Sequence, residues 1–145
     1  MSRVSTYLNF LRSTEQALIF YRSVFGGQFA GPINRLSEVP SMPGQPPLAE
    51  SDKNLVLHVE LPILGGHVLM GTDAPESMGF SLSQGNNTYI NLEPDTRAEA
   101  HKLFNALSIN GKVEMPLQEM FWGGYFGSLT DQFGIHWMFN GSSKT

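Results

Sequence analysis

The sequence predicts an α+β protein made of two tandem βαβββ modules that together form a half-open barrel. Two observations lead to this prediction. The same capped amphipathic helix occurs twice, with its start repeated 83 residues later. The strands and glycines around the two helices also correspond in order, which is typical of a duplicated unit. We expect a single domain over residues 1–145, with module one at about 4–73 and module two at about 86–140.

The two predicted helices follow one pattern. Each begins with the spacing of a capping box, in which two side chains satisfy free backbone amides at the helix start. Each box is followed by an apolar stripe at i, i+3, i+4 and i+7, which predicts one buried helix face. The boxes are Ser13 with Gln16 and Thr96 with Glu99; the stripes are Ala17, Phe20, Tyr21 and Val24, then Ala100, Leu103, Phe104 and Leu107. Gly26 should end the first helix, because glycine enters the left-handed C-terminal conformation without strain.

Alternating apolar residues between turn residues predict four strands in each module. They cover residues 4–10, 28–36, 54–61 and 67–72 in module one, and 88–92, 112–118, 124–130 and 135–140 in module two. Matching glycines after the helices lie 84 residues apart, whereas the closing strands lie 68 apart, so module one contains 84 − 68 = 16 extra residues. We assign these residues to a mobile surface loop at about 38–53, which is rich in Pro, Ser and Gly.

The composition argues against several classes of function. Nine basic and thirteen acidic residues give a net charge of −4, whereas nucleic-acid binders normally carry a basic stripe. The absence of cysteine excludes disulfides, thiolate metal sites and a cysteine nucleophile, and it fits a cytoplasmic location. No run of residues approaches the roughly 18 apolar residues of a membrane span. No glycine-rich strand-to-helix loop is present for a nucleotide-like cofactor, and we expect no cofactor.

Strand alternation sorts the side chains between a face covered by the helix and a free concave face. On the first strand, Leu8 and Phe10 should pack on the helix, which turns Tyr7 and Asn9 to the concave face. On the third strand, the predicted apolar face is Leu55, Leu57, Val59 and Leu61, opposite Val56, His58 and Glu60. The predicted ligand-binding residues are Tyr7, Asn9, His58, Glu60, Met70, Tyr89, Asn91, Trp122, Phe126, His136 and Met138.

This mixed wall, mostly apolar and aromatic with a few polar groups, is typical of a small-molecule pocket. The alternative is that these side chains fill the barrel and hydrogen-bond one another. Trp122, with Phe121 beside a pair of glycines, is placed as an aromatic lid, and its alternative role is a partly buried anchor at a sheet edge. Asp73 and Asp131 are expected to be turn residues that accept hydrogen bonds from backbone amides.

The paired modules, the helix end at 20–27 and the run 121–127 (FWGGYFG) resemble the vicinal oxygen chelate superfamily. That superfamily contains glyoxalase I, extradiol dioxygenases and bleomycin-resistance proteins, and the ending 130–138 (TDQFGIHWM) is most similar to its PhnB-like branch. The resemblance implies a homodimer and four metal-binding corners, on the first and last strand of each module. These corners fall on Tyr7, Met70, Tyr89 and Met138. Because thioether is a poor ligand for zinc, iron, nickel or magnesium, we predict no metal there.

The leading hypothesis is therefore a metal-free, PhnB-like protein that binds a small organic molecule in a concave cleft. Pure binding and turnover both fit this hypothesis, and no catalytic residue follows from it. The alternative is a metal-dependent lyase, isomerase or dioxygenase, in which His58, Glu60 and His136 hold a metal ion with water at the open position.

Overall fold

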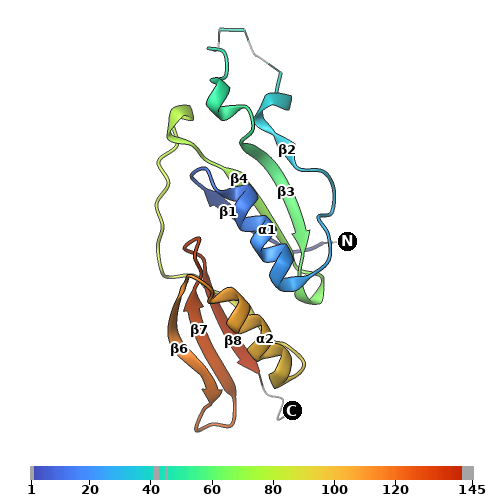
Figure 1. Cartoon of the computed structure of the whole chain (residues 1–145), viewed down its shortest axis with the longest axis vertical. Helices are drawn as coiled ribbons and strands as arrows, with labels where there is room; N and C mark the ends of the chain where they lie inside the picture. The colour runs from blue at the N-terminus through green and yellow to red at the C-terminus, as the bar shows by residue number, and fades with distance from the viewer. Residues whose placement is uncertain (1, 41–42, 45, 142–145) are drawn as a thin grey trace. The chain divides into compact units, whose positions relative to one another are not determined.

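The computed structural model describes residues 2–40, 43, 44 and 46–141, and it divides into two compact units, Met1–Leu82 and Ser83–Thr145. Each unit is one module with a helix and a four-stranded sheet (Figure 1). Module one contains β1 (Thr6–Phe10), α1 (Thr14–Phe25), β2 (Asn34–Arg35), β3 (Val56–Pro62) and β4 (Val68–Asp73). Module two contains β5 (Ile90–Leu92), α2 (Arg97–Leu107), β6 (Lys112–Glu119), β7 (Tyr125–Thr130) and β8 (His136–Gly141). The predicted α+β fold with two tandem modules is confirmed, while the half-open barrel that they would form stays a prediction.

The two sheets have the same topology. The strand orders are β1-β4-β3-β2 and β5-β8-β7-β6, so each strand of module one has a counterpart at the same place in module two. In both sheets the first and last strands of the module pair in parallel, and the other pairs are antiparallel. Helix α1 packs on β3 and β4, and α2 packs on β7 and β8. This correspondence is what a duplication predicts.

Each module has its own core between the sheet and the helix. In module one the fully buried side chains include Leu18 and Tyr21 of α1 and Leu61 of β3. In module two they include Trp137 of β8, and the rings of Phe104 and Phe139 meet edge to face at 5.4 Å. The predicted helix stripes are buried except Phe20, which is half-buried. The opposite face of each sheet, which we call the open face, has no helix on it within its own module.

Helix α1 starts differently from the prediction. Ser13 has φ −117° and ψ 17°, and its side chain accepts no capping hydrogen bond. The Thr14 N–H instead donates to Asp73 Oδ1 at 3.1 Å, so a carboxylate from the end of β4 caps the helix. In α2 the predicted cap is confirmed, since Thr96 is extended and accepts from the Glu99 N–H at 3.1 Å. The capping-box spacing therefore works only where the backbone before the helix is extended.

The predicted faces of β3 are wrong at its first residues. Val56 is almost fully buried and Leu57 is exposed, the reverse of the expected alternation. Arg35 pairs with Val56 and Asn34 with His58, so β3 advances two residues where β2 advances one. Leu57 is therefore the extra residue of a β-bulge, which shifts the alternation by one. The strand expected at 28–36 is also shorter than predicted, because only Asn34–Arg35 forms ladder bonds.

Part of the predicted loop at about 38–53 is anchored, while residues 41, 42 and 45 lie outside the described residues. The short 3₁₀ turns of the chain are η1 (Leu36–Glu38), η2 (Glu50–Asp52), η3 (Leu64–Gly66) and η4 (Glu76–Met78). In η2 the Asp52 side chain is buried, accepting from Arg12 Nη1 at 2.8 Å and from Ser77 Oγ at 2.6 Å. Mobility of the rest of the loop stays a prediction.

Candidate functional site

The open face of module one carries a chain of three polar side chains. Tyr7 of β1 places its hydroxyl 3.3 Å from His58 Nδ1, and the other ring nitrogen of His58 lies 2.8 Å from Glu60 Oε2. Both His58 and Glu60 come from β3, where the spacing of two puts them on one face. Tyr7 is 49% exposed, so its ring is accessible on this face. The predicted inward orientation of Leu8 and its neighbours is confirmed by the burial of Leu8.

Glu60 is the charged group of this cluster. The hydrogen bond from His58 lowers the pKa of Glu60, and the nearby Arg3 guanidinium, at 3.5 Å from Glu60 Oε1, lowers it further. Glu60 is therefore ionised at neutral pH. Sequence reasoning missed Arg3, which precedes β1 and falls outside the strand alternation that was used to find inward residues. It adds a basic group to a face on which none was expected.

The open face of module two carries a second, differently connected cluster. Tyr89 donates its hydroxyl hydrogen to Glu114 Oε1 at 2.8 Å, and Thr130 Oγ1 lies 2.9 Å from Glu114 Oε2. Thr130 Oγ1 also lies 2.8 Å from His136 Nδ1, whose other ring nitrogen is 2.8 Å from the Gly85 carbonyl oxygen. Both ring nitrogens of His136 therefore have hydrogen-bond partners inside module two.

The two acidic protons of this cluster are shifted in opposite directions. The hydrogen bond to the Glu114 carboxylate raises the pKa of Tyr89, because the phenol loses that bond when it ionises. Burial acts to raise the pKa of Glu114, but the hydrogen bonds from Tyr89 and Thr130 outweigh it and lower the pKa. Sequence reasoning missed Glu114 and Thr130. Their alternation with the predicted inward residues across β6 and β7 is the signal that could have found them.

The remaining predicted residues surround these clusters. Asn91 accepts from Asn140 Nδ2 at 2.8 Å and donates to Glu93. Phe126 and Met138 are half-buried, and Phe126 lies on the same side of β7 as Thr130 by alternation. Asn9, one pair along from Tyr7 on β1, is exposed.

Trp122 lies at the tip of the hairpin between β6 and β7, away from both polar clusters in the chain of hydrogen bonds. Its ring is 58% exposed and meets the ring of Phe121, which is 97% exposed, at a centroid distance of 4.8 Å. The indole lies against Gly124, where a Cβ atom would fall 2.5 Å from Trp122 Nε1. This packing explains the paired glycines, and the role of Trp122 as a lid stays a prediction.

The sheet registers correct one of the four metal corners. In module one Tyr7 lies opposite Met70, and in module two Asn91, rather than Tyr89, lies opposite Met138. The closing hairpins keep the offset of 68, because Glu60 pairs with Met70 as Ser128 pairs with Met138. The first strands therefore correspond at an offset of 91 − 7 = 84 in the sheet, although their similar residues lie 82 apart.

The corner residues do not fit the divalent metal that the superfamily resemblance implies. They offer a phenol, an amide and two thioethers, whereas such cations prefer carboxylate, imidazole or water. Met70 Sδ accepts from Ser5 Oγ at 3.8 Å, and the Asn91 oxygen is taken by Asn140. Within either module, the part of the chain that the structure describes holds no group of three His, Asp or Glu side chains placed to bind a metal ion.

Two concavities lie outside the polar clusters. In module one a cavity of about 600 Å³ is lined mainly by apolar side chains, including Leu36, Leu57 and Met78, with Asp52 at its polar side. Its size is within the range of small-molecule sites, about 300–1,000 Å³. Sequence reasoning missed this cavity, because it depends on the bulge that turns Leu57 outward.

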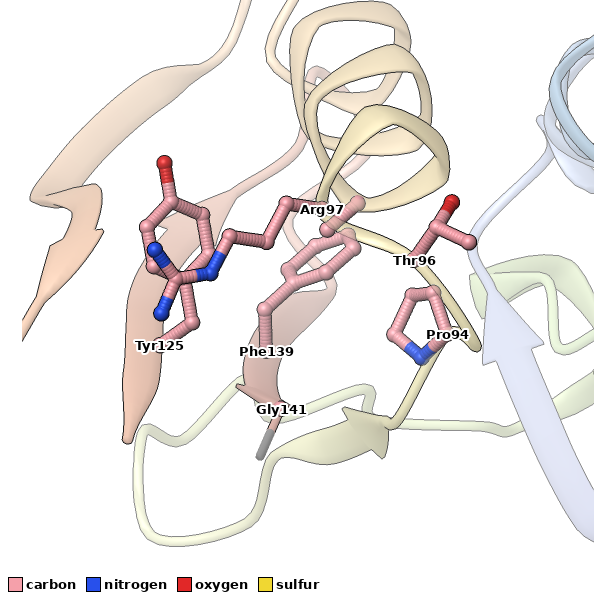
Figure 2. A pocket seen from close by; sticks show the side chains of 7 residues that line it. Pro94, Thr96, Arg97, Tyr125, Phe139 and Gly141 are labelled. Atoms are coloured by element: carbon pink, nitrogen blue, oxygen red, sulfur yellow. The ribbon is translucent and has the colours of Figure 1, made fainter. Parts of the chain in front are cut away.

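The second concavity is a small hollow of about 10 Å³ at the start of α2, with room for one water molecule. Figure 2 shows the Arg97 guanidinium beside the ring of Tyr125, at 4.2 Å from the ring centroid. Arg97 also binds Glu119 at 2.8 Å. This hollow lies on the side of the sheet that α2 covers and is too small for an organic ligand.

The fold and these faces define a protein of the glyoxalase type. Residues 6–139 match the Glyoxalase/Bleomycin resistance protein/Dioxygenase superfamily, and the chain belongs to this superfamily. The predicted superfamily is thus confirmed. Among the helices that the structure describes, none is both long and apolar enough to span a membrane.

Three relatives match over almost their whole length. Protein PA1353 from Pseudomonas aeruginosa is 30% identical with a TM-score of 0.81, over 97% of this chain and 98% of that protein. The PhnB protein from Bacillus cereus is 25% identical with a TM-score of 0.72, over 97% and 99%. Protein YjdN from Escherichia coli K12 is 29% identical over 142 residues, which are 94% of this chain and 93% of that protein. The PhnB relative supports the predicted branch of the superfamily.

Proposed function

We propose that this chain is a metal-free, PhnB-like member of the superfamily that binds a small organic molecule on the open faces of its modules. One observation supports the proposal most strongly. Each open face presents an aromatic hydroxyl held by an ionisable partner, Tyr7 with His58 and Tyr89 with Glu114. Such fixed polar groups among aromatic and methionine side chains orient a ligand with hydrogen-bonding groups.

The same faces support binding without a metal. The corner donors are phenol, thioether and amide, and the amide of Asn91 is already paired with Asn140. A ligand would therefore contact the hydroxyls and the carboxylates directly. Exposed apolar side chains at the hairpin tip, Phe121 and Trp122, supply surface that a bound molecule could cover.

Elemental analysis tests the metal-free part of the proposal. The full chain is purified without chelator, and zinc, iron, nickel and manganese are measured by mass spectrometry. We expect less than about 0.1 metal ion per chain. One ion per chain that is lost in the His58→Ala variant would support the alternative, a metal-dependent lyase, isomerase or dioxygenase that uses His58, Glu60 and His136.

A fragment screen tests the binding part. Amide and aromatic NMR shifts of the labelled chain are followed while a library of small carbonyl, phenol and amide compounds is added. We expect hits that shift Tyr7, His58, Tyr89 or His136 and that weaken in the Tyr7→Phe variant. The matched control is Lys102→Ala, an exposed change on α2. A library without hits at these residues contradicts the proposal.

We further propose a cytoplasmic homodimer. The strands β2 and β6 end the two sheets, and β6 is exposed along almost its whole length, with Val113 and Met115 uncovered. Edge strands of this kind are normally covered. Light scattering should give a mass of about twice the 16.0 kDa of one chain, and a monomer at all concentrations would contradict the dimer.

A further inference from the structure

The Tyr7–His58–Glu60 chain has the connectivity of a nucleophile, a base and an orienting carboxylate. In such arrangements the base lies within hydrogen-bond reach of the nucleophile, often loosely before the ligand binds, and a third group orients the base. The hydroxyl of Tyr7 is 3.3 Å from His58 Nδ1, and Glu60 Oε2 is 2.8 Å from His58 Nε2. All three side chains lie on one open face of module one.

The protonation of Glu60 determines which way the hydrogens point. Because the hydrogen bond from His58 lowers the pKa of Glu60, its carboxylate is ionised and can only accept. The His58 Nε2 atom must then carry a hydrogen. In the neutral ring this leaves Nδ1 with its lone pair directed at Tyr7, so that the Tyr7 hydroxyl donates to it.

We propose that Tyr7 is a nucleophile activated by His58, with Glu60 as a positioning residue, and that its substrate class is small molecules with an activated acyl group. The Tyr7 oxygen bonds to the acyl carbon while its hydrogen passes to His58 Nδ1. The bond from that carbon to the leaving group then breaks, and the leaving atom takes the proton from His58. The product is an acyl ester of Tyr7, and His58 returns to its neutral form. This step rests on the proposed function, since the bound small molecule carries the acyl group.

Tyr89 provides an internal comparison in module two. Its hydroxyl donates to the carboxylate of Glu114, and this bond raises the pKa of Tyr89. A carboxylate is a much weaker base than imidazole, with an ordinary pKa near 4.3 against about 6.5. Tyr89 therefore holds its proton, and the two related positions are expected to differ in reactivity.

Acetylation by N-acetylimidazole tests the nucleophile without any knowledge of the natural ligand. The intact chain is treated at neutral pH, and peptide mass spectrometry follows acetylation of Tyr7 and Tyr89 with time. We expect Tyr7 to react about tenfold faster in the wild type than in His58→Gln, short of the roughly 10²–10⁴-fold of complete active sites. Tyr89 should react at one slow rate in both proteins and serves as the reference.

The positioning role of Glu60 has its own readout. Nitrogen NMR of labelled histidine should show the Nε2–H tautomer of His58 in the wild type and a mixture of tautomers in Glu60→Gln, with an intermediate acetylation rate of Tyr7. Circular dichroism checks that both variants are folded. Equal rates at Tyr7 in the wild type and in folded His58→Gln would overturn the proposal, as would an unchanged tautomer in Glu60→Gln.

The acetylation result and the fragment screen separate the two proposals. N-acetylimidazole is itself the acyl donor, so slow acetylation of Tyr7 refutes the nucleophile and leaves ligand binding to the screen. Fast acetylation together with an empty screen supports the nucleophile and contradicts the proposed binding site.

Discussion

Replacement of Asp131 should destabilise module two more than any change in the neighbouring turn. Its carboxylate is 4% exposed and accepts three hydrogen bonds, from the N–H groups of Phe133 and Ile135 at 2.8 and 3.1 Å and from Trp137 Nε1 at 2.8 Å. Trp137 is fully buried, so in Asp131→Ala water cannot replace the lost acceptor at its indole. The prediction of Asp131 as a turn residue that binds backbone amides is confirmed here, and the indole bond is additional.

The magnitude follows from the three bonds. A buried donor that loses its acceptor costs about 1–3 kcal/mol, and each bond to a turn amide contributes about 0.5–1.5 kcal/mol. We therefore expect Asp131→Ala to lower the free energy of unfolding by about 4 kcal/mol, a large share of the roughly 5–15 kcal/mol of a typical domain. Asp131→Asn keeps one oxygen for the turn but turns an amide group toward the indole, so its expected cost is about 2 kcal/mol.

Urea denaturation followed by far-ultraviolet circular dichroism measures these free energies. Gln132→Ala, an exposed side chain in the same turn, is the matched control and should change stability by less than about 0.5 kcal/mol. A double-mutant cycle with Trp137→Phe isolates the indole bond, and we expect Asp131→Asn to cost much less in that background. A loss below about 1 kcal/mol for Asp131→Ala, or additive effects in the cycle, would refute this reasoning.

Three further predictions concern other parts of the chain. Gly71→Ala should lower the melting temperature, because its Cβ would lie 2.7 Å from a threonine methyl group at the start of α1, whereas Gly31→Ala, which meets no atom within 4 Å, should not; equal melting curves contradict the clash. The pKa of Asp52 is lowered by hydrogen bonds from serine and arginine side chains, so its stabilisation is present above its ordinary pKa and lost as the pH falls through the lowered one; acid unfolding of Asp52→Asn should be less steep. Ultraviolet titration should show Tyr89 ionising above the ordinary tyrosine range, and Glu114→Gln should bring it back, whereas an unchanged curve would show that this bond is not formed in solution.

Features that depend on nearby residues were predictable from the sequence. The α2 cap needs only Thr96 and an amide three residues later, and the Asp131 turn binds its own loop. The inward face of β1 follows from simple alternation, and the burial of Leu8 and Phe10 agrees with it. Local hydrogen bonds and the period of two leave few alternatives in such segments.

Features that depend on distant pairing were not predictable. The cap of α1 comes from Asp73, 59 residues beyond the amide that it binds, and no local pattern reports it. The bulge at Leu57 depends on the register of β2 against β3. The partner of Tyr89 is likewise Glu114, 25 residues away on an edge strand. The candidate site was therefore found as a set of inward residues, while its connections required coordinates.

The two-residue difference between the parallel strand pairs has a consequence for protein engineering. Anyone who wishes to restore an ancestral chelating centre would choose positions by matching the two halves of the sequence, and would place an imidazole at 89. The backbone pairing instead puts residue 91 beside Met138, as residue 7 is beside Met70. Grafted donors should therefore be installed at 7, 70, 91 and 138, because a donor at 89 would stand two positions out of line with its intended neighbour.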